Sequence, residues 1–265
     1  MKGTIMIGAI IGDIIGSRFE GMNSVPENFE LVVEHSKFTD DTVHTIAIAK
    51  AIAEHKQTGQ NLEELSVKYL QEFGRRYIWC GCGDKFYEWL FKFSPEPYGS
   101  YGNGAVMRVS PCAYLSSSHK QADEYAQTVT AVTHNHPDAV CAARAVTMAI
   151  CLLKQGASKE KMLKKLIHKR LYKPSSIPKG FDVTAKGTLN IAMQAFMNGD
   201  SFESVIRNAV IYAGDTDTNA AVAGSIAEAY YGVPQELKEM CFNKLDDFLK
   251  ETLIEVSKIT DICIL

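Results

Sequence analysis

The chain has 265 residues, of which 46% are hydrophobic and 22% are charged, and its formal net charge is −3. These values are ordinary for a globular protein, and they argue against a nucleic-acid binder, which usually carries a basic patch. The Lys- and Arg-rich stretch 154–173 is a local exception that we interpret as the solvated face of a helix. The length suits one large domain, so we predict a single domain over residues 1–265.

Apolar residues recur at helical spacing along almost the whole chain, which predicts an all-α fold. The first apolar run is too short to cross a bilayer and is soon followed by Asp13, Arg18 and Glu20, so we interpret it as a buried helix and not as a signal peptide. No other stretch predicts a membrane helix. The expected helices cover residues 3–16, 42–57, 61–74, 83–93, 105–115, 120–132, 137–155, 158–170, 184–199, 201–212, 217–231 and 234–256.

Several helix ends have recognisable signals. Pro137 suits a first helical position, where its missing N–H is not needed. Asp217, or Thr218 with the next residue, can cap the helix that ends at Gly232, and Pro234 can begin the next helix. Only residues 29–33 and 259–265 hint at a strand, and 172–183 is the best candidate for an exposed connection.

The seven cysteines indicate reduced thiols. Their number is odd, and most lie in apolar helical patterns, so we predict a cytoplasmic protein without a disulfide framework. Cys80 and Cys82 form a C-x-C motif, but no second pair follows at zinc spacing, and a zinc site is therefore disfavoured.

Two acid-rich segments each precede an apolar helix. The first is Thr39-Asp40-Asp41-Thr42, and the second is Asp215-Thr216-Asp217-Thr218. Each segment alone is explained by helix capping, because Asp and Thr are favoured at helix starts. A cap does not explain why the same Asp/Thr cluster occurs twice, whereas oxygen-only donors suit Mg²⁺ or Mn²⁺. We therefore favour a metal centre, and a helix start can fill both roles.

Three further segments are candidates for ligand contacts. Gly99-Ser100-Tyr101-Gly102-Asn103-Gly104 is a glycine-rich turn whose N–H groups could hold a phosphate, although it is not a P-loop. In Thr133-His134-Asn135-His136-Pro137 the two His do not share a helical face, so a capping or hydrogen-bonding role for one of them is preferred to metal binding. Glu20 is either a catalytic acid or a surface charge.

Taken in order, these segments resemble the ADP-ribosylglycohydrolase family over residues 3 to about 232. The resemblance includes Gly12-Asp13-x-x-Gly16 with Glu20, both acid clusters, Gly102-Asn103-Gly104-x-x-Met107-Arg108 and Thr133-His134-x-His136-Pro137. It implies a compact orthogonal helical bundle that holds two Mg²⁺ or Mn²⁺ ions. The implied metal ligands are Thr39, Asp40, Asp41, Asp215, Asp217 and Thr218.

The resemblance also implies the reaction, which is cleavage of the glycosidic bond between ADP-ribose and a modified side chain. A carboxylate, from Glu20 or from a cluster residue such as Asp41 or Asp217, would act as acid or base. The implied substrate contacts are Ser100, Tyr101, Gly102, Asn103, Gly104 and His134.

The acceptor is the least determined part of this resemblance. Arginine-specific members tend to carry an Asp before Gly102, and this chain has Ser100-Tyr101 there, which leans toward an O-linked, serine-type acceptor. The expected partner is an ADP-ribosylated protein or an ADP-ribosyl small molecule. Two alternatives stay open: a catalytically silent ADP-ribose binder, and a hydrolase of a free metabolite such as O-acetyl-ADP-ribose. The sequence predicts no oligomeric state.

Overall fold

The computed structural model describes residues 6–177 and 180–262, and within these ranges the regular structure is helical apart from one isolated β-bridge between Gly102 and Thr184. The all-α prediction is therefore confirmed. The α-helices are α1 (Gly8–Gly16), α2 (Asp40–Thr58), α3 (Leu62–Arg76), α4 (Asp84–Leu90), α5 (Gly104–Met107), α6 (Ser110–Tyr114), α7 (His119–Ala131), α8 (Pro137–Lys154), α9 (Lys159–His168), α10 (Ala185–Asn198), α11 (Phe202–Ile211), α12 (Thr216–Tyr231), α13 (Gln235–Lys244) and α14 (Asp247–Thr260). Two 3-10 turns, η1 (Ser17–Phe19) and η2 (Ile78–Cys80), follow α1 and α3.

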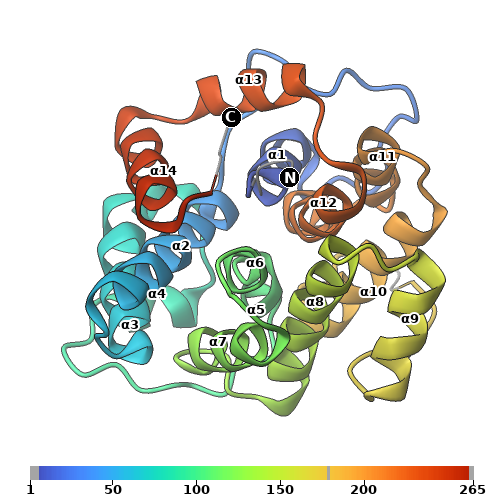
Figure 1. Ribbon diagram of the computed structural model, residues 1–265. Helices are drawn as coiled ribbons and strands as arrows, with labels where there is room; N and C mark the ends of the chain where they lie inside the picture. The colour runs from blue at the N-terminus through green and yellow to red at the C-terminus, as the bar shows by residue number, and fades with distance from the viewer. Residues whose placement is uncertain (1–5, 178–179, 263–265) are drawn as a thin grey trace.

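Helices α1 and α12 lie side by side within a ring formed by the other helices (Figure 1). In this view α1 and α6 are seen nearly end-on, whereas α13 runs across the picture, so the helix axes cross steeply. This arrangement is the orthogonal bundle that the resemblance implied. None of the helices in the described ranges combines the length and apolarity needed to cross a membrane.

The contact between α1 and α12 is made by backbone atoms. Gly8, Gly12 and Gly16 follow one another at a spacing of four and lie on one face of α1. A Cβ atom on Gly12 would lie 2.0 Å from the carbonyl oxygen of Ala220, and one on Gly16 would lie 2.4 Å from that of Thr216. Only glycine permits so close an approach, and the two helix axes are therefore fixed relative to each other.

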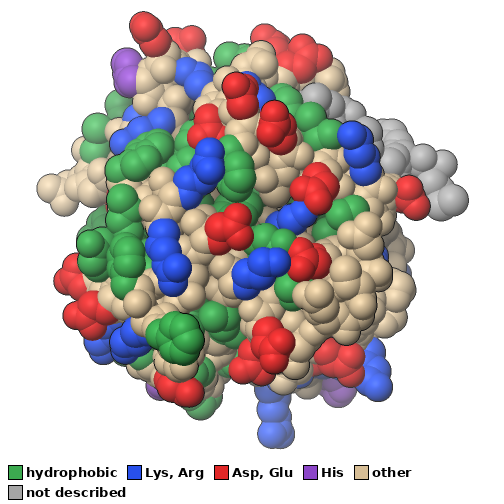
Figure 2. Space-filling view, turned by 90° about the vertical axis from the view of Figure 1, so that its left-hand side faces the viewer, with side chains coloured by type: hydrophobic (Ala, Val, Ile, Leu, Met, Phe, Trp, Pro, Cys, Tyr) green, Lys and Arg blue, Asp and Glu red, His purple; other side chains and the backbone are tan. Residues whose placement is uncertain are grey.

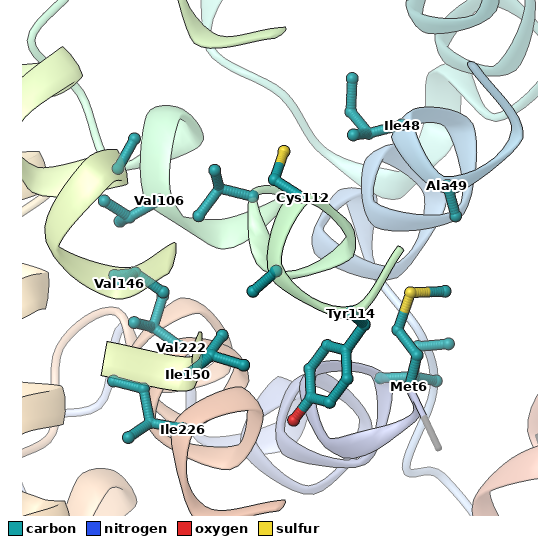
Figure 3. Packing of buried hydrophobic residues seen from close by; sticks show 14 of the residues in the cluster. Met6, Ile48, Ala49, Val106, Cys112, Tyr114, Val146, Ile150, Val222 and Ile226 are labelled. Atoms are coloured by element: carbon teal, nitrogen blue, oxygen red, sulfur yellow. The ribbon is translucent and has the colours of Figure 1, made fainter. Parts of the chain in front are cut away.

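The hydrophobic core extends outward from this pair of helices. Figure 3 shows Cys112 of α6 among side chains from several elements, including Ile48 of α2, Val106 of α5, Val146 of α8 and Val222 of α12. These residues are buried, so α6 is enclosed by helices from both halves of the chain. The assignment of residues 1–265 to one domain stays a prediction.

Two predicted helices are each divided in two. The range 105–115 contains α5 and α6, because Pro111 has no N–H to donate to the carbonyl of Met107, which instead accepts a bond from the Thr45 hydroxyl at 3.2 Å. The range 234–256 divides at Asp246, whose carboxylate accepts from the backbone N–H of Leu249 at 3.0 Å and caps α14.

The predicted helix ends are partly confirmed. Pro137 is the first residue of α8, Gly232 follows the end of α12, and Pro234 precedes α13. The predicted cap of α12 is wrong, because the helix begins earlier, at Thr216, and Asp215 in the N-cap position makes no side-chain cap bond. Asp217 lies within the first turn, where its Oδ1 accepts from the backbone N–H of Thr218 at 2.9 Å.

The strand hints are also wrong where the structure describes them. Residues 29–33 are irregular, and α14 extends to Thr260, while 263–265 lie outside the described residues. The predicted connection 172–183 contains no helix or strand in its described part, and residues 178–179 lie outside the description. The six cysteines described are all free thiols, and Cys263 lies outside the described residues.

Charges are mixed on the face that lies to the left of Figure 1, where α2, α3 and α14 are found. Figure 2 shows Lys and Arg side chains interspersed with Asp and Glu over this face. No continuous basic surface is visible there, as we expect for a chain with a net charge of −3.

Candidate active site

The two acid clusters meet at the starts of α2 and α12. Thr39 caps α2, since its hydroxyl accepts from the backbone N–H of Asp41 at 3.3 Å. The hydroxyl of Thr218, in the first turn of α12, donates to Oδ2 of Asp41 at 3.1 Å and joins the two clusters. Residues separated by 177 positions in sequence thereby become neighbours.

A cavity of about 680 Å³ opens beside this junction, which is within the usual size range of small-molecule sites. Most of the predicted site residues line it. They are Glu20, Asp40, Asp41, Asp215, Asp217, Thr218, Ser100, Gly102, Asn103, Gly104 and His134.

Two predicted residues do not line the cavity. Thr39 is buried behind the start of α2, where its hydroxyl also donates to Oδ1 of Asp13 at 2.8 Å. Tyr101 is 58% exposed, and its ring packs edge-on against His136 and not into the cavity. Their roles as metal ligand and substrate contact stay predictions.

The carboxylates at the junction repel one another. Burial, and then the neighbouring carboxylates, raise the pKa values of Asp40, Asp41 and Asp217 well above their ordinary range. Burial and the charge of Asp215 likewise raise the pKa of Glu20. Among the described residues, no hydrogen-bond partner reaches the buried Oδ1 of Asp41, so this oxygen can accept a ligand.

A divalent cation fits the chemistry of this junction, because it would both neutralise the carboxylates and bind the unpaired oxygen. The available donors are oxygens of Asp and Thr, as hard cations prefer. Within residues 6–177 and 180–262, however, no three Asp, Glu, His or Cys side chains are close enough together to enclose an ion as they stand.

Asp13 is a site residue that the sequence analysis did not single out. Its fully buried carboxylate accepts from the backbone N–H groups of Thr39 and Thr42 at 2.9 and 3.0 Å, and also from both threonine hydroxyls. Burial outweighs these bonds and raises its pKa to about 6. The sequence feature that could have identified it is a single acid inside the apolar run Ile10-Ile11-Gly12-Asp13-Ile14-Ile15. Asp13 fixes the first turn of α2, which carries the first acid cluster.

The glycine-rich turn is tied to the second acid cluster. The Asn103 side chain donates to Oδ2 of Asp215 at 2.6 Å, and the Asn103 backbone N–H donates to the carbonyl of Val183 at 2.8 Å. The N–H groups of Gly99 and Gly102 donate to Asn135 and to the Ser100 hydroxyl. These three N–H groups donate to acceptors within the protein, so fewer N–H groups of the turn are available to bind a phosphate than the sequence predicts.

The cavity wall also carries His134, His44 and Arg108, of which only His134 was predicted as a site residue, and Nδ1 of His44 lies 3.8 Å from Oδ2 of Asp40. Burial, and then the charge of Arg108, lower the pKa of His134 well below its ordinary value and that of His44 to about 3. Both imidazoles are therefore neutral. The other histidine of the motif, His136, accepts from the Asp138 N–H at 3.1 Å and caps α8, which confirms the predicted capping role.

The cysteines of the C-x-C motif lie on the cavity wall near Asp40. Burial, followed by the charge of Asp40, raises the pKa of Cys80 to about 12 and that of Cys82 to about 11. Both thiols stay protonated at neutral pH.

The fold and the site define a class of protein: an orthogonal helical bundle in which two Asp/Thr helix starts meet at one ligand-sized cavity. The family model described as ADP-ribosylglycohydrolase matches residues 4–261, and the chain belongs to this family.

Several characterised proteins are similar in sequence. The ADP-ribosyl-[dinitrogen reductase] glycohydrolase of Rhodospirillum rubrum is 25% identical over 91% of this chain and 88% of its own length. ADP-ribosylhydrolase ARH3 of Xenopus tropicalis and the ADP-ribosylarginine hydrolase Tri1 of Pseudomonas putida are 28% and 30% identical, over 49% and 55% of this chain. The chain matches less than half the length of these two relatives, 43% and 42%.

A solved structure titled "ADP-ribosylglycohydrolase-related protein complex" has a TM-score of 0.75, covers 96% of both chains and is 24% identical. This likeness confirms the helical fold.

Proposed function

We propose that the chain is a metal-dependent ADP-ribosylhydrolase that cleaves the glycosidic bond between ADP-ribose and a modified side chain and releases ADP-ribose. The observation that carries the proposal is the meeting of both acid clusters at one cavity, where no other described residue bonds to the buried Oδ1 of Asp41. Membership of the ADP-ribosylglycohydrolase family supports it.

The metal-holding residues in this proposal are Thr39, Asp40, Asp41, Asp215, Asp217 and Thr218. When bound, Mg²⁺ or Mn²⁺, as two ions, would supply positive charge that orients the ribose hydroxyls and lowers the pKa of a water. The Asp13 carboxylate and the Asn103 amide hold the two clusters in place from outside, through Thr39 and Asp215.

The proton transfers are assigned to carboxylates of the same cavity. Glu20 is exposed and lines the cavity, so it can exchange protons with solvent between turnovers. Its raised pKa keeps a larger fraction protonated near neutral pH than an ordinary Glu has, which suits an acid that protonates a leaving group. Asp41 and Asp217 are the alternative acid–base residues, because their pKa values are raised as well.

The substrate contacts in this proposal are made by the glycine-rich turn and His134. Ser100, Gly102, Asn103 and Gly104 line the same cavity as the acid clusters, so a bound ADP-ribose would contact both the turn and the clusters. Glycosidic cleavage passes through an oxocarbenium-like state, and a carboxylate of the cavity that is not bound to a metal, such as Glu20, could stabilise its positive charge.

The acceptor is proposed to be O-linked, as in ADP-ribosyl-serine. The support is the sequence Ser100-Tyr101 before Gly102, which offers no carboxylate to pair with a guanidinium. An arginine acceptor is the alternative.

A substrate panel tests the proposal. The purified chain is given ADP-ribosyl-serine, ADP-ribosyl-arginine, poly-ADP-ribose and O-acetyl-ADP-ribose, with Mg²⁺ or with EDTA, and released ADP-ribose is measured. We expect release from the serine conjugate with Mg²⁺ and loss of activity with EDTA. Asp217→Asn should lower the rate by about a hundredfold or more, the range for an acid–base or metal-holding carboxylate.

The matched control is Asp200→Asn, which changes an exposed aspartate outside the cavity and should leave the rate unchanged. Full activity of Asp217→Asn, or full activity in EDTA, contradicts the metal-dependent mechanism. Tight binding of ADP-ribose without any turnover identifies a silent binder, and release from O-acetyl-ADP-ribose alone identifies a metabolite hydrolase.

A further inference from the structure

A buried relay of polar side chains lies behind His134 on the cavity wall. Nη2 of Arg108 donates to the hydroxyl of Thr133 at 2.5 Å, and this hydroxyl lies 2.7 Å from Nδ1 of His134. Arg108, Thr133 and His134 are 1%, 0% and 5% exposed, so solvent does not compete for these bonds. The arrangement of the donors determines where the protons lie.

Thr133 has one hydroxyl proton, and its position decides the tautomer of His134. Arg108 can only donate, so the Thr133 oxygen accepts from it. Among the described residues, Arg108 and His134 are the only hydrogen-bond partners of this hydroxyl. If Nδ1 carried a proton and donated to Thr133, the Thr133 O–H would be buried without an acceptor, at a cost of about 1–3 kcal/mol. The satisfied arrangement has Thr133 donating to an unprotonated Nδ1.

The opposite edge of the imidazole faces the ligand site. An unprotonated Nδ1 in a neutral ring leaves the proton on Nε2. Nε2 lies beside the glycine-rich turn, since a Cβ atom on Gly104 would be 3.0 Å from it. His134 lines the cavity, and no described residue accepts a hydrogen bond from Nε2. This N–H is thus a donor directed at whatever lies along the turn.

Burial, followed by the charges of Arg108 and His44, lowers the pKa of His134 and keeps its ring neutral. Arg108 is buried close to the ring, and among the described residues no carboxylate forms a salt bridge with it and no hydrogen-bond partner reaches its Nε. A second positive charge on His134 is disfavoured so close to it, and burial acts in the same direction on the pKa of the ring.

We infer that Thr133, held by Arg108, is a positioning residue that fixes His134 as a neutral imidazole with its proton on Nε2, and that this N–H donates to an oxygen atom of the ligand. The identity of the ligand as ADP-ribose rests on the proposed function. The tautomer rests on the relay alone.

The tautomer is tested by long-range ¹H–¹⁵N NMR of the full chain labelled with ¹⁵N-histidine, with His134→Gln used to assign the signals. We expect an unprotonated Nδ1 and a protonated Nε2 that stay unchanged from about pH 8 to about pH 5.5, a range that spans the ordinary titration of histidine. A proton on Nδ1, or a titration near the ordinary value, overturns the inference. This measurement needs no ligand and no variant of Thr133.

The ligand contact is tested by calorimetry with ADP-ribose and Mg²⁺ on a matched pair of variants. Thr133→Val keeps the shape of the side chain but removes the hydroxyl, and we expect about tenfold weaker binding, as for loss of one oriented hydrogen bond. Thr133→Ser keeps the hydroxyl and should bind as the natural chain does. Equal binding by both variants refutes the positioning role, and the natural chain failing to bind ADP-ribose refutes the proposed function while leaving the NMR result intact.

Discussion

Replacing Gly12 by Ala tests the close contact between α1 and α12. The added methyl group would lie 2.0 Å from a backbone oxygen and 2.3 Å from a backbone carbon of Ala220, so no side-chain rotation can relieve the clash. Overpacking in a core costs about 1–3 kcal/mol, and a clash with backbone belongs at the upper end of that range. The higher helix propensity of Ala compared with Gly offsets about 1 kcal/mol of this cost. We therefore expect Gly12→Ala to lower the free energy of unfolding by about 2 kcal/mol.

The measurement is urea unfolding followed by circular dichroism, with the midpoint and slope compared between variants. Gly83→Ala is the matched control, because no atom lies within 4 Å of its added methyl group and its φ of −67° suits alanine. We expect this control to change the free energy by less than about 0.5 kcal/mol. If Gly12→Ala is as stable as Gly83→Ala, the two backbones are not in contact and the reasoning fails.

Three further predictions concern buried carboxylates. The Glu228 carboxylate accepts from the N–H of Gly8 at 2.7 Å, and burial raises its pKa from 4.5 to about 7, so the folded state favours the protonated form. The stability advantage of the natural chain over Glu228→Gln should therefore fall by about 3 kcal/mol as pH rises from about 4.5 to above 7. Parallel curves of unfolding free energy against pH for the two chains would exclude this. Asp13→Asn removes one carboxylate oxygen that accepts hydrogen bonds from Thr39 and Thr42, and it should lower the free energy of unfolding in urea by about 2 kcal/mol. Calorimetry should also show weaker Mg²⁺ binding. If neither value changes, Asp13 does not support the site. Mg²⁺ should raise the thermal unfolding midpoint of the natural chain. The increase should be smaller at low pH, because protons compete with Mg²⁺ for carboxylates such as Asp41, whose pKa is raised. An increase that does not depend on pH would contradict a carboxylate site.

The sequence predicts those features that are local. Helices such as α8 and α10 follow from apolar spacing, because an amphipathic period is set by the geometry of the helix itself. The acid clusters were found for the same reason, since each lies within four consecutive residues. The division at Pro111 could also have been predicted, because a proline inside a helical pattern removes a donor.

The features that the sequence did not reveal depend on contacts between distant segments. Asp13 binds residues 26 and 29 positions away, and its four bonds give no periodic signal. Tyr101 lies within the turn that the sequence predicts to contact the ligand, yet its ring packs against His136, and only the fold determines which way it points. Arg108 belongs to the Gly102-to-Arg108 motif, but its role depends on the hydrogen bond that it donates to Thr133. Thr133 lies far away in sequence, in the connection between α7 and α8.

The short helix α1 holds both acid clusters of the site in position. On one side, Asp13 fixes the first turn of α2 through Thr39, and with it the first acid cluster. On the other side, the carbonyl of Gly16 accepts from the Thr216 hydroxyl at 2.9 Å, beside the close backbone contact that fixes the start of α12 and the second cluster. The two clusters therefore repel each other across a distance that α1 sets and that core packing maintains. A bundle that holds like charges together in this way stores unfavourable electrostatic energy, and binding of a cation between the clusters would release it.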